Sequence, residues 1–119
     1  MSGSIEEIRP VFEQLERHMF DVVNGVQDGK EIRRCAFKQT EQLSKQLTSL
    51  LKGQELLPRY ILLQLSQAAN ILQNEASYMP TTADKQEAFR MANAIQVTLN
   101  LILRGECHDD RRPGIPRII

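Results

Sequence analysis

The chain has 119 residues, enough for one domain with a single hydrophobic core. Hydrophobic residues make up 41% and charged residues 25%, a composition typical of a globular protein rather than a disordered one. Fifteen basic residues balance fifteen acidic residues, so the formal net charge is zero. This balance argues against direct binding to nucleic acid or to an anionic membrane, and it favours self-association.

The sequence also predicts a cytoplasmic protein that is not a membrane protein. The start, MSGSIEEIRP, lacks the basic region and the apolar region of a secretory signal. The longest uncharged apolar stretch is shorter than the ~20 residues that a membrane span requires. Two cysteines, Cys35 and Cys107, are too few for a disulfide framework in a chain of this size, so we expect both to be free thiols.

The first predicted helix has two possible starting points. Ser4 and Glu7 have the spacing of a capping box, which marks a helix N-terminus. Pro10 follows, and a proline inside a helix removes a hydrogen bond and clashes with the preceding turn. Either residues 4–9 form a separate turn, or the main helix begins near Pro10.

Apolar residues then alternate three and four apart, which is the seam of a coiled coil or bundle. Turn dipeptides at 24–25 and 28–29 predict that this helix ends between residues 24 and 27. The seam consists of Ile5, Ile8, Phe12, Leu15, Met19, Val22 and Val26.

Two more helices are expected in the middle of the chain. One should start near Asp28 and run to Lys52, with Gly53 as its C-terminal stop because glycine enters the left-handed region freely. The next should begin at Pro58, a favoured first helical residue, and run to about Tyr78. The seam predicted for residues 28–52 is Ile32, Ala36, Gln39, Leu43, Leu47 and Leu50.

A fourth helix should be capped by Thr81 or Thr82 and stopped by Gly105. Its segment 88–103 carries no charge after Arg90 and has apolar residues on two faces. A surface helix normally has one apolar stripe, so this helix is either the centre of the bundle or half core and half interface.

Four helices with short connections predict an all-α, antiparallel helical bundle with an irregular C-terminal tail. We assign residues 1–105 to the bundle domain. Residues 106–119 contain two prolines and are expected to form a flexible tail with an apolar end.

Two groups of residues could bind a metal ion or act in catalysis. His18 and Asp21 share a helix face, but the Glu-x-x-His pattern of di-metal bundles is absent. The run from Cys107 to Asp110 offers four ligands in a row, yet consecutive residues rarely converge on one ion. We therefore predict no catalytic, cofactor-binding or metal-binding residue and expect a protein that is not an enzyme.

Large apolar residues outside the single seams are more informative. Such residues, aromatic ones above all, are typical of interface hot spots. The alternative is that a short bundle buries wide apolar faces internally. The predicted partner or dimer contacts are Phe20, Val23, Phe37, Tyr60, Val97, Leu101, Ile115, Ile118 and Ile119.

The layout, with NAIQVTLNLIL in the last helix followed by PGIPRII, resembles the small helical anti-activators of bacterial quorum sensing. The resemblance is to the QslA type and, more distantly, to the TraM type. It implies a cytoplasmic homodimer without catalytic activity. Such a protein would bind the ligand-binding domain of a LuxR-type transcription regulator and block that regulator's dimerisation and DNA binding. The resemblance carries no functional residue over by position.

Two other functions fit a small helical bundle. An export chaperone of the flagellar or type III kind would bind a disordered segment of a secreted protein in an apolar groove. A metal-dependent or other helical enzyme would use His18 with Asp21, or the run from Cys107 to Asp110.

Overall fold

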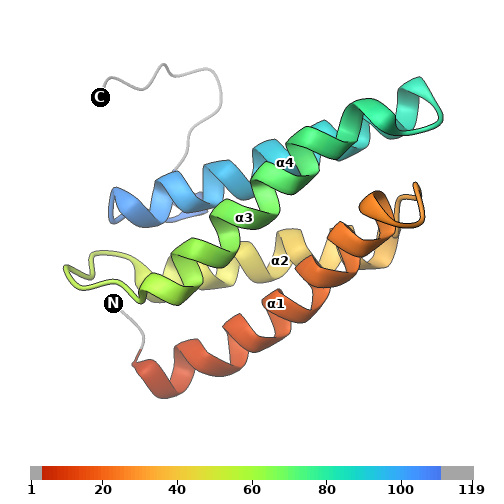
Figure 1. Ribbon diagram of the computed structural model, residues 1–119. Coiled ribbons are helices and arrows are strands. Elements are labelled where there is room, and N and C mark those ends of the chain that lie inside the picture. Colours follow the sequence, from red (N-terminus) through yellow and green to blue (C-terminus); the bar gives the residue numbers. More distant parts are fainter. Residues whose placement is uncertain (1–3, 111–119) are drawn as a thin grey trace.

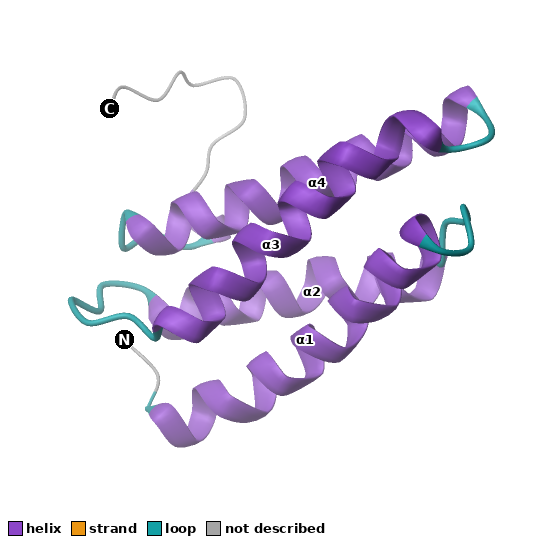
Figure 2. Cartoon of the chain, in the orientation of Figure 1, coloured by secondary structure: helices purple, strands orange, loops and turns teal. Residues whose placement is uncertain are grey.

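The computed structural model describes residues 4–110. Within this range the chain forms four α-helices and two short 3-10 turns, and Figure 2 shows no strand among the coloured segments. The prediction of an all-α bundle is confirmed. The elements are α1 (Ile5–Gln27), α2 (Arg34–Leu51), α3 (Arg59–Glu75), η1 (Ala76–Tyr78), α4 (Thr82–Leu103) and η2 (His108–Asp110).

The helices form two hairpins that pack against each other. The first hairpin pairs α1 with α2 and the second pairs α3 with α4, while α1 lies beside α3 and α2 lies beside α4 (Figure 1). Partners within a hairpin are antiparallel, and the neighbours across the two hairpins run in the same direction. None of the described helices has the length and apolar composition needed to cross a membrane.

The capping box decides where α1 begins. The Ser4 hydroxyl accepts a hydrogen bond from the Glu7 N–H at 3.3 Å, and the Ser4 N–H donates to Glu7 Oε1 at 3.2 Å. The helix therefore starts at Ile5 and continues through Pro10, which lies inside it. Both predicted alternatives, a separate turn over residues 4–9 and a main helix that starts near Pro10, are therefore wrong. The predicted end within residues 24–27 is confirmed.

The second helix starts at Arg34, six residues later than predicted. Lys30 has a φ of 51°, a left-handed conformation that interrupts a helix. Arg33 then crosses back over α1, where its guanidinium lies 2.7 Å from the Asp21 carboxylate. A Cβ on the buried Gly25 would come within 3.0 Å of the Arg33 side chain, so glycine makes this crossing possible.

The remaining helix ends follow their predicted signals closely. Pro58 is the N-cap of α3, and the last predicted turn of that helix is the 3-10 turn η1. The Thr81 hydroxyl caps α4 by accepting from the Asp84 N–H at 3.0 Å. Gly53 and Gly105 have φ values of 75° and 73°, so both stop signals are confirmed. The Gly53 N–H donates to the Gly105 carbonyl at 3.2 Å, which joins the ends of α2 and α4.

One contiguous core fills the space between the two hairpins. It contains the predicted seam of α1 from Ile8 onward, together with Phe37 and Leu47 of α2, Leu65 of α3 and Ile95 of α4. Other buried positions of α2 are occupied by Thr40, Ser44 and Thr48.

Residues 105–110, here called the C-terminal strap, pack against the bundle and correct the prediction of a flexible tail from residue 106. Cys107 is only 5% exposed. The His108 N–H donates to Thr48 Oγ1 at 3.3 Å, and Asp110 accepts a hydrogen bond from Lys52 at 2.8 Å. The bundle domain thus extends to at least Asp110. The rest of the predicted tail, with Ile115, Ile118 and Ile119, lies outside the described residues.

Candidate functional site

The structure divides the predicted interface residues into three groups. Phe20, Val23 and Tyr60 come together on the side of the bundle where α1 lies beside α3. Val97 is half-buried and lines a cleft on the opposite side, between α2 and α4. Phe37 and Leu101 are buried.

The interpretation of Phe37 and Leu101 as surface residues is therefore corrected. Phe37 is 3% exposed and belongs to the core, because α2 buries a wider arc than the predicted seam. Leu101 is 2% exposed. It lies three residues after Thr98 on the same face of α4, and Thr98 Oγ1 is 2.9 Å from Nε2 of His108 in the strap. The strap returns to this end of α4, where the Glu106 N–H donates to the Leu101 carbonyl at 2.9 Å, and the sequence pattern did not indicate this return.

The α1–α3 groove has a volume of about 200 Å³ and is built from one face of each helix. The α1 positions follow helical spacing, as do those of α3, so each set forms a single row along its helix. Phe20 is 64% exposed beside the groove, whereas Val23 is half-buried within it. The lining residues are Glu16, Met19, Phe20, Val23, Asn24, Gln27, Gln64, Gln67, Ala68 and Ile71.

Tyr60 is fixed next to this groove by two contacts. Its ring packs edge-on against Phe12, with centroids 5.8 Å apart and an interplanar angle of 88°. Its hydroxyl donates to Glu16 Oε2 at 2.5 Å, and this hydrogen bond raises the pKa of the Tyr60 phenol above its ordinary value. Glu16 is the only charged residue among those lining the groove, which is otherwise apolar or amide in character. Such a surface suits helix packing better than ion recognition.

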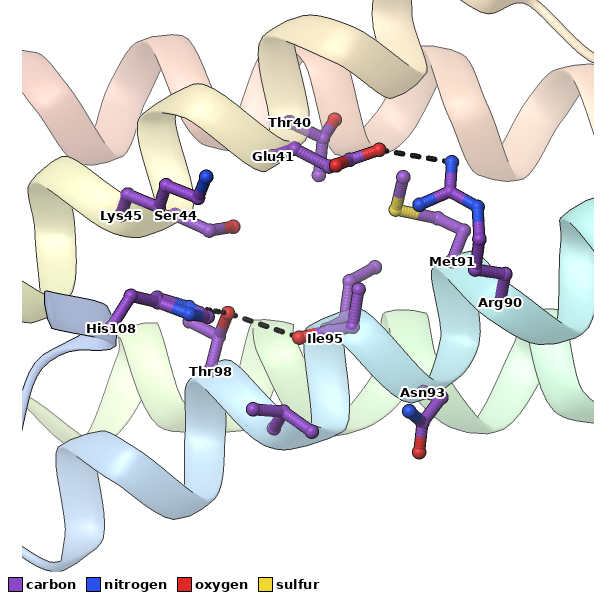
Figure 3. A pocket seen from close by; sticks show the side chains of 12 residues that line it. Thr40, Glu41, Ser44, Lys45, Arg90, Met91, Asn93, Ile95, Thr98 and His108 are labelled. Carbon is purple, nitrogen blue, oxygen red and sulfur yellow. Dashed lines mark hydrogen bonds and ion pairs between the residues drawn. The ribbon is translucent and has the colours of Figure 1, made fainter. Parts of the chain in front are cut away.

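The α2–α4 cleft has a volume of about 250 Å³ and is closed at one end by His108 of the strap (Figure 3). Its walls combine hydroxyl and charged side chains with an apolar floor. The lining residues are Thr40, Glu41, Ser44, Lys45, Arg90, Met91, Asn93, Ala94, Ile95, Val97, Thr98 and His108.

An ion-pair network lies at the other end of the cleft. Arg90 contacts the carboxylates of Glu87 at 2.7 Å and of Glu41 at 3.0 Å, so it links α4 to α2. The hydrogen bonds that Arg90 donates to the carboxylates of Glu87 and Glu41 raise the pKa of Arg90, and the same contact lowers the pKa of Glu87. The positive charge of Arg90 is therefore neutralised by carboxylates of the protein itself.

The residues considered for metal binding do not form a site. Asp21 pairs with Arg33, away from any cluster with His18. In the strap, His108 contacts Thr98 while Asp110 contacts Lys52, so these side chains diverge. Across residues 4–110, no three His, Cys, Asp or Glu side chains lie close enough to hold a metal ion. Both cysteines are free, with Cys35 exposed and Cys107 buried.

Sequence reasoning missed the α2–α4 cleft. Thr40, Ser44 and Thr48 recur every four residues and so share one helix face, a pattern that could have indicated a polar stripe on the buried side of α2. The contribution of His108 had no such signal, because it depends on the strap folding back onto Thr98.

Comparisons of the chain with protein-family models, with curated proteins and with solved structures found no match. Inferences about function therefore depend on the groove and the cleft themselves.

Proposed function

We propose that this protein is a non-enzymatic interaction protein that binds an amphipathic helix of a partner in the α1–α3 groove. The observation that carries the proposal is the 64% exposure of Phe20 beside a groove lined by apolar and amide side chains. Amphipathic helices commonly bind by placing their apolar face in a hydrophobic groove. Aromatic residues at the edge of such a groove are typical hot spots.

The exposed area of Phe20 is large enough to contribute to affinity. A fully buried phenylalanine removes about 200 Å² from water. Covering the exposed 64% of Phe20 would bury about 130 Å², worth about 3 kcal/mol before the costs of association. Tyr60 is 57% exposed and is already held in position by Phe12 and Glu16, so covering it costs little side-chain entropy.

For the partner, we propose the ligand-binding domain of a LuxR-type transcription regulator, as the resemblance to quorum-sensing anti-activators suggests. A groove with a single charged lining residue would depend on apolar burial, which is how a helix from a dimer interface is recognised. Binding would occupy the regulator's own dimerisation surface and remove its DNA-binding form. In this proposal the protein acts in the cytoplasm, and its zero net charge permits a homodimer.

Co-expression with a LuxR-type regulator, followed by size-exclusion chromatography, tests the proposal. We expect a single complex peak for the wild type and separate peaks for Phe20→Ser. Phe89→Ser is the matched control, because Phe89 is also exposed, at 37%, but lies on α4 outside the groove. Separate elution of the wild-type proteins would contradict the regulator proposal, and equal binding by both variants would contradict the groove. Capture of a disordered secreted segment instead would favour an export chaperone.

A further inference from the structure

A serine hydroxyl without a protein partner opens onto the α2–α4 cleft. Four polar residues of the described chain are buried. Three of them are satisfied internally, since Thr40, Thr48 and Thr98 each donate to a carbonyl of the same helix. Ser44 is 4% exposed, and within residues 4–110 its hydroxyl makes no hydrogen bond. The hydroxyl oxygen itself keeps contact with solvent, because no described side-chain oxygen is both fully buried and without a partner. Figure 3 shows the Ser44 oxygen pointing into the space between α2 and α4.

The residue that follows Ser44 carries an uncompensated positive charge. Lys45 lines the same cleft, and the described part of the chain provides no carboxylate within ion-pair distance of its ammonium. Arg90, by contrast, is neutralised by Glu41 and Glu87. The end of the cleft near Ser44 therefore favours a negative charge that can also accept a hydrogen bond.

The floor and size of the cleft restrict what can accompany that charge. Met91, Ala94, Ile95 and Val97 provide an apolar surface along α4. A cavity of ~150 Å³ accepts a benzene molecule. By proportion, the cleft of about 250 Å³ accommodates about ten non-hydrogen atoms.

We propose that the α2–α4 cleft binds a small organic monoanion, consisting of a carboxylate on a flat apolar body. The carboxylate accepts hydrogen bonds from the Ser44 hydroxyl and the Lys45 ammonium, and the apolar body lies against Met91 and Ile95. Because the cleft lies on the opposite side of the bundle from the α1–α3 groove, this site is independent of the proposed partner site.

Titration of the isotope-labelled full chain with phenylacetate, followed by amide NMR spectra, tests the proposal. Phenylacetate has about ten non-hydrogen atoms and matches the estimated volume. We expect saturable shifts centred on residues 40–45, 90–98 and 108, with a dissociation constant of about 0.1–1 mM. Phenylacetamide, the neutral isostere, should bind at least about tenfold more weakly because it lacks the negative charge.

Two variants separate site binding from general effects. Lys45→Gln should weaken phenylacetate binding about fivefold, while Lys38→Gln, an exposed lysine on the same helix outside the cleft, should leave it unchanged. Ala94→Leu should fill the half-buried apolar wall and abolish binding while the helical circular dichroism signal is retained. The proposal would be overturned if no saturable shifts appeared or if the shifts centred on the α1–α3 groove. It would also be overturned if phenylacetamide bound as tightly as phenylacetate, or if both lysine variants lost the same affinity.

Discussion

Replacing Phe37 with alanine tests whether the second turn of α2 belongs to the core or to an interface. Phe37 is 3% exposed within the single chain, so the substitution removes a buried aromatic ring and leaves a cavity. Such substitutions cost about 3–5 kcal/mol. For a domain of this size, 1 kcal/mol corresponds to about 4 °C in Tm, so we expect Tm to fall by about 12–20 °C.

Urea unfolding followed by far-ultraviolet circular dichroism measures this loss, because the signal reports directly on the four helices. Phe20→Ala is the matched control. Phe20 is 64% exposed, and surface substitutions away from special features usually change the free energy of unfolding by less than ~0.5 kcal/mol. A loss below about 1 kcal/mol for Phe37→Ala would refute its assignment to the core and restore it as an interface residue.

Three further predictions concern the C-terminal strap. Gly105 has a φ of 73°, so Gly105→Ala should lower the free energy of unfolding, measured in urea, by about 1–2 kcal/mol. An unchanged free energy of unfolding would contradict the left-handed conformation of Gly105. Hydrogen bonds donated by Lys52 and by the Cys107 N–H lower the pKa of Asp110 from 3.8 to about 2. The contacts of the Asp110 carboxylate therefore stabilise the fold fully above about pH 4, and this stabilisation is lost as the pH falls towards 2. In Lys52→Gln the pKa should rise towards 3.8 in a carboxyl NMR titration, and an unshifted midpoint would contradict the ion pair. A chain ending at Gly105 loses the buried Cys107 and the hydrogen bonds of the strap, so its free energy of unfolding should be about 2 kcal/mol below that of a chain ending at Asp110. Identical thermal transitions of the two chains would show that the strap does not stabilise the bundle.

The helix boundaries that could be predicted are those set by local chemistry. Ser4 with Glu7 forms a reciprocal cap from four consecutive residues, and Thr81 caps α4 through the N–H three residues later. Gly53 and Gly105 stop helices because of their own backbone conformation. None of these signals depends on a distant part of the chain, so the sequence suffices to locate them.

The start of α2 could not be predicted in the same way. Asp28 and Glu31 have the spacing of a helix start, yet the chain forms a loop there. That loop is stabilised by Arg33, which pairs with Asp21 twelve residues earlier and passes over Gly25. The distant contacts outweigh the local preference, since intrinsic helix propensity is a weak effect.

The predicted seam of α2 was correct at Ala36, Leu43 and Leu47, which are buried, but wrong at Gln39 and incomplete on its polar side. Gln39 is exposed and Leu50 is half-buried, whereas the neighbouring Thr40 and Leu51 are buried. A threonine can occupy a core position on a helix because its hydroxyl donates to a carbonyl in the preceding turn, as Thr40 does to Ala36 at 2.7 Å. The buried arc is consequently wider than the predicted seam by about one residue on one side, and it includes Phe37.

The second apolar face of α4 separates into two parts for a physical reason. Leu101 lies at the end where the strap returns and is fully covered, whereas Val97, one turn earlier, remains half-buried on the open cleft. Within the strap, His108 contacts Thr98 and Asp110 pairs with Lys52 near the end of α2. The sequence pattern predicts one interface face on α4, but this face belongs partly to the buried interior and partly to the α2–α4 cleft. Val97, unlike Leu101, lines the cleft, where the proposed anionic ligand would also contact Ser44 and Lys45 on the facing helix.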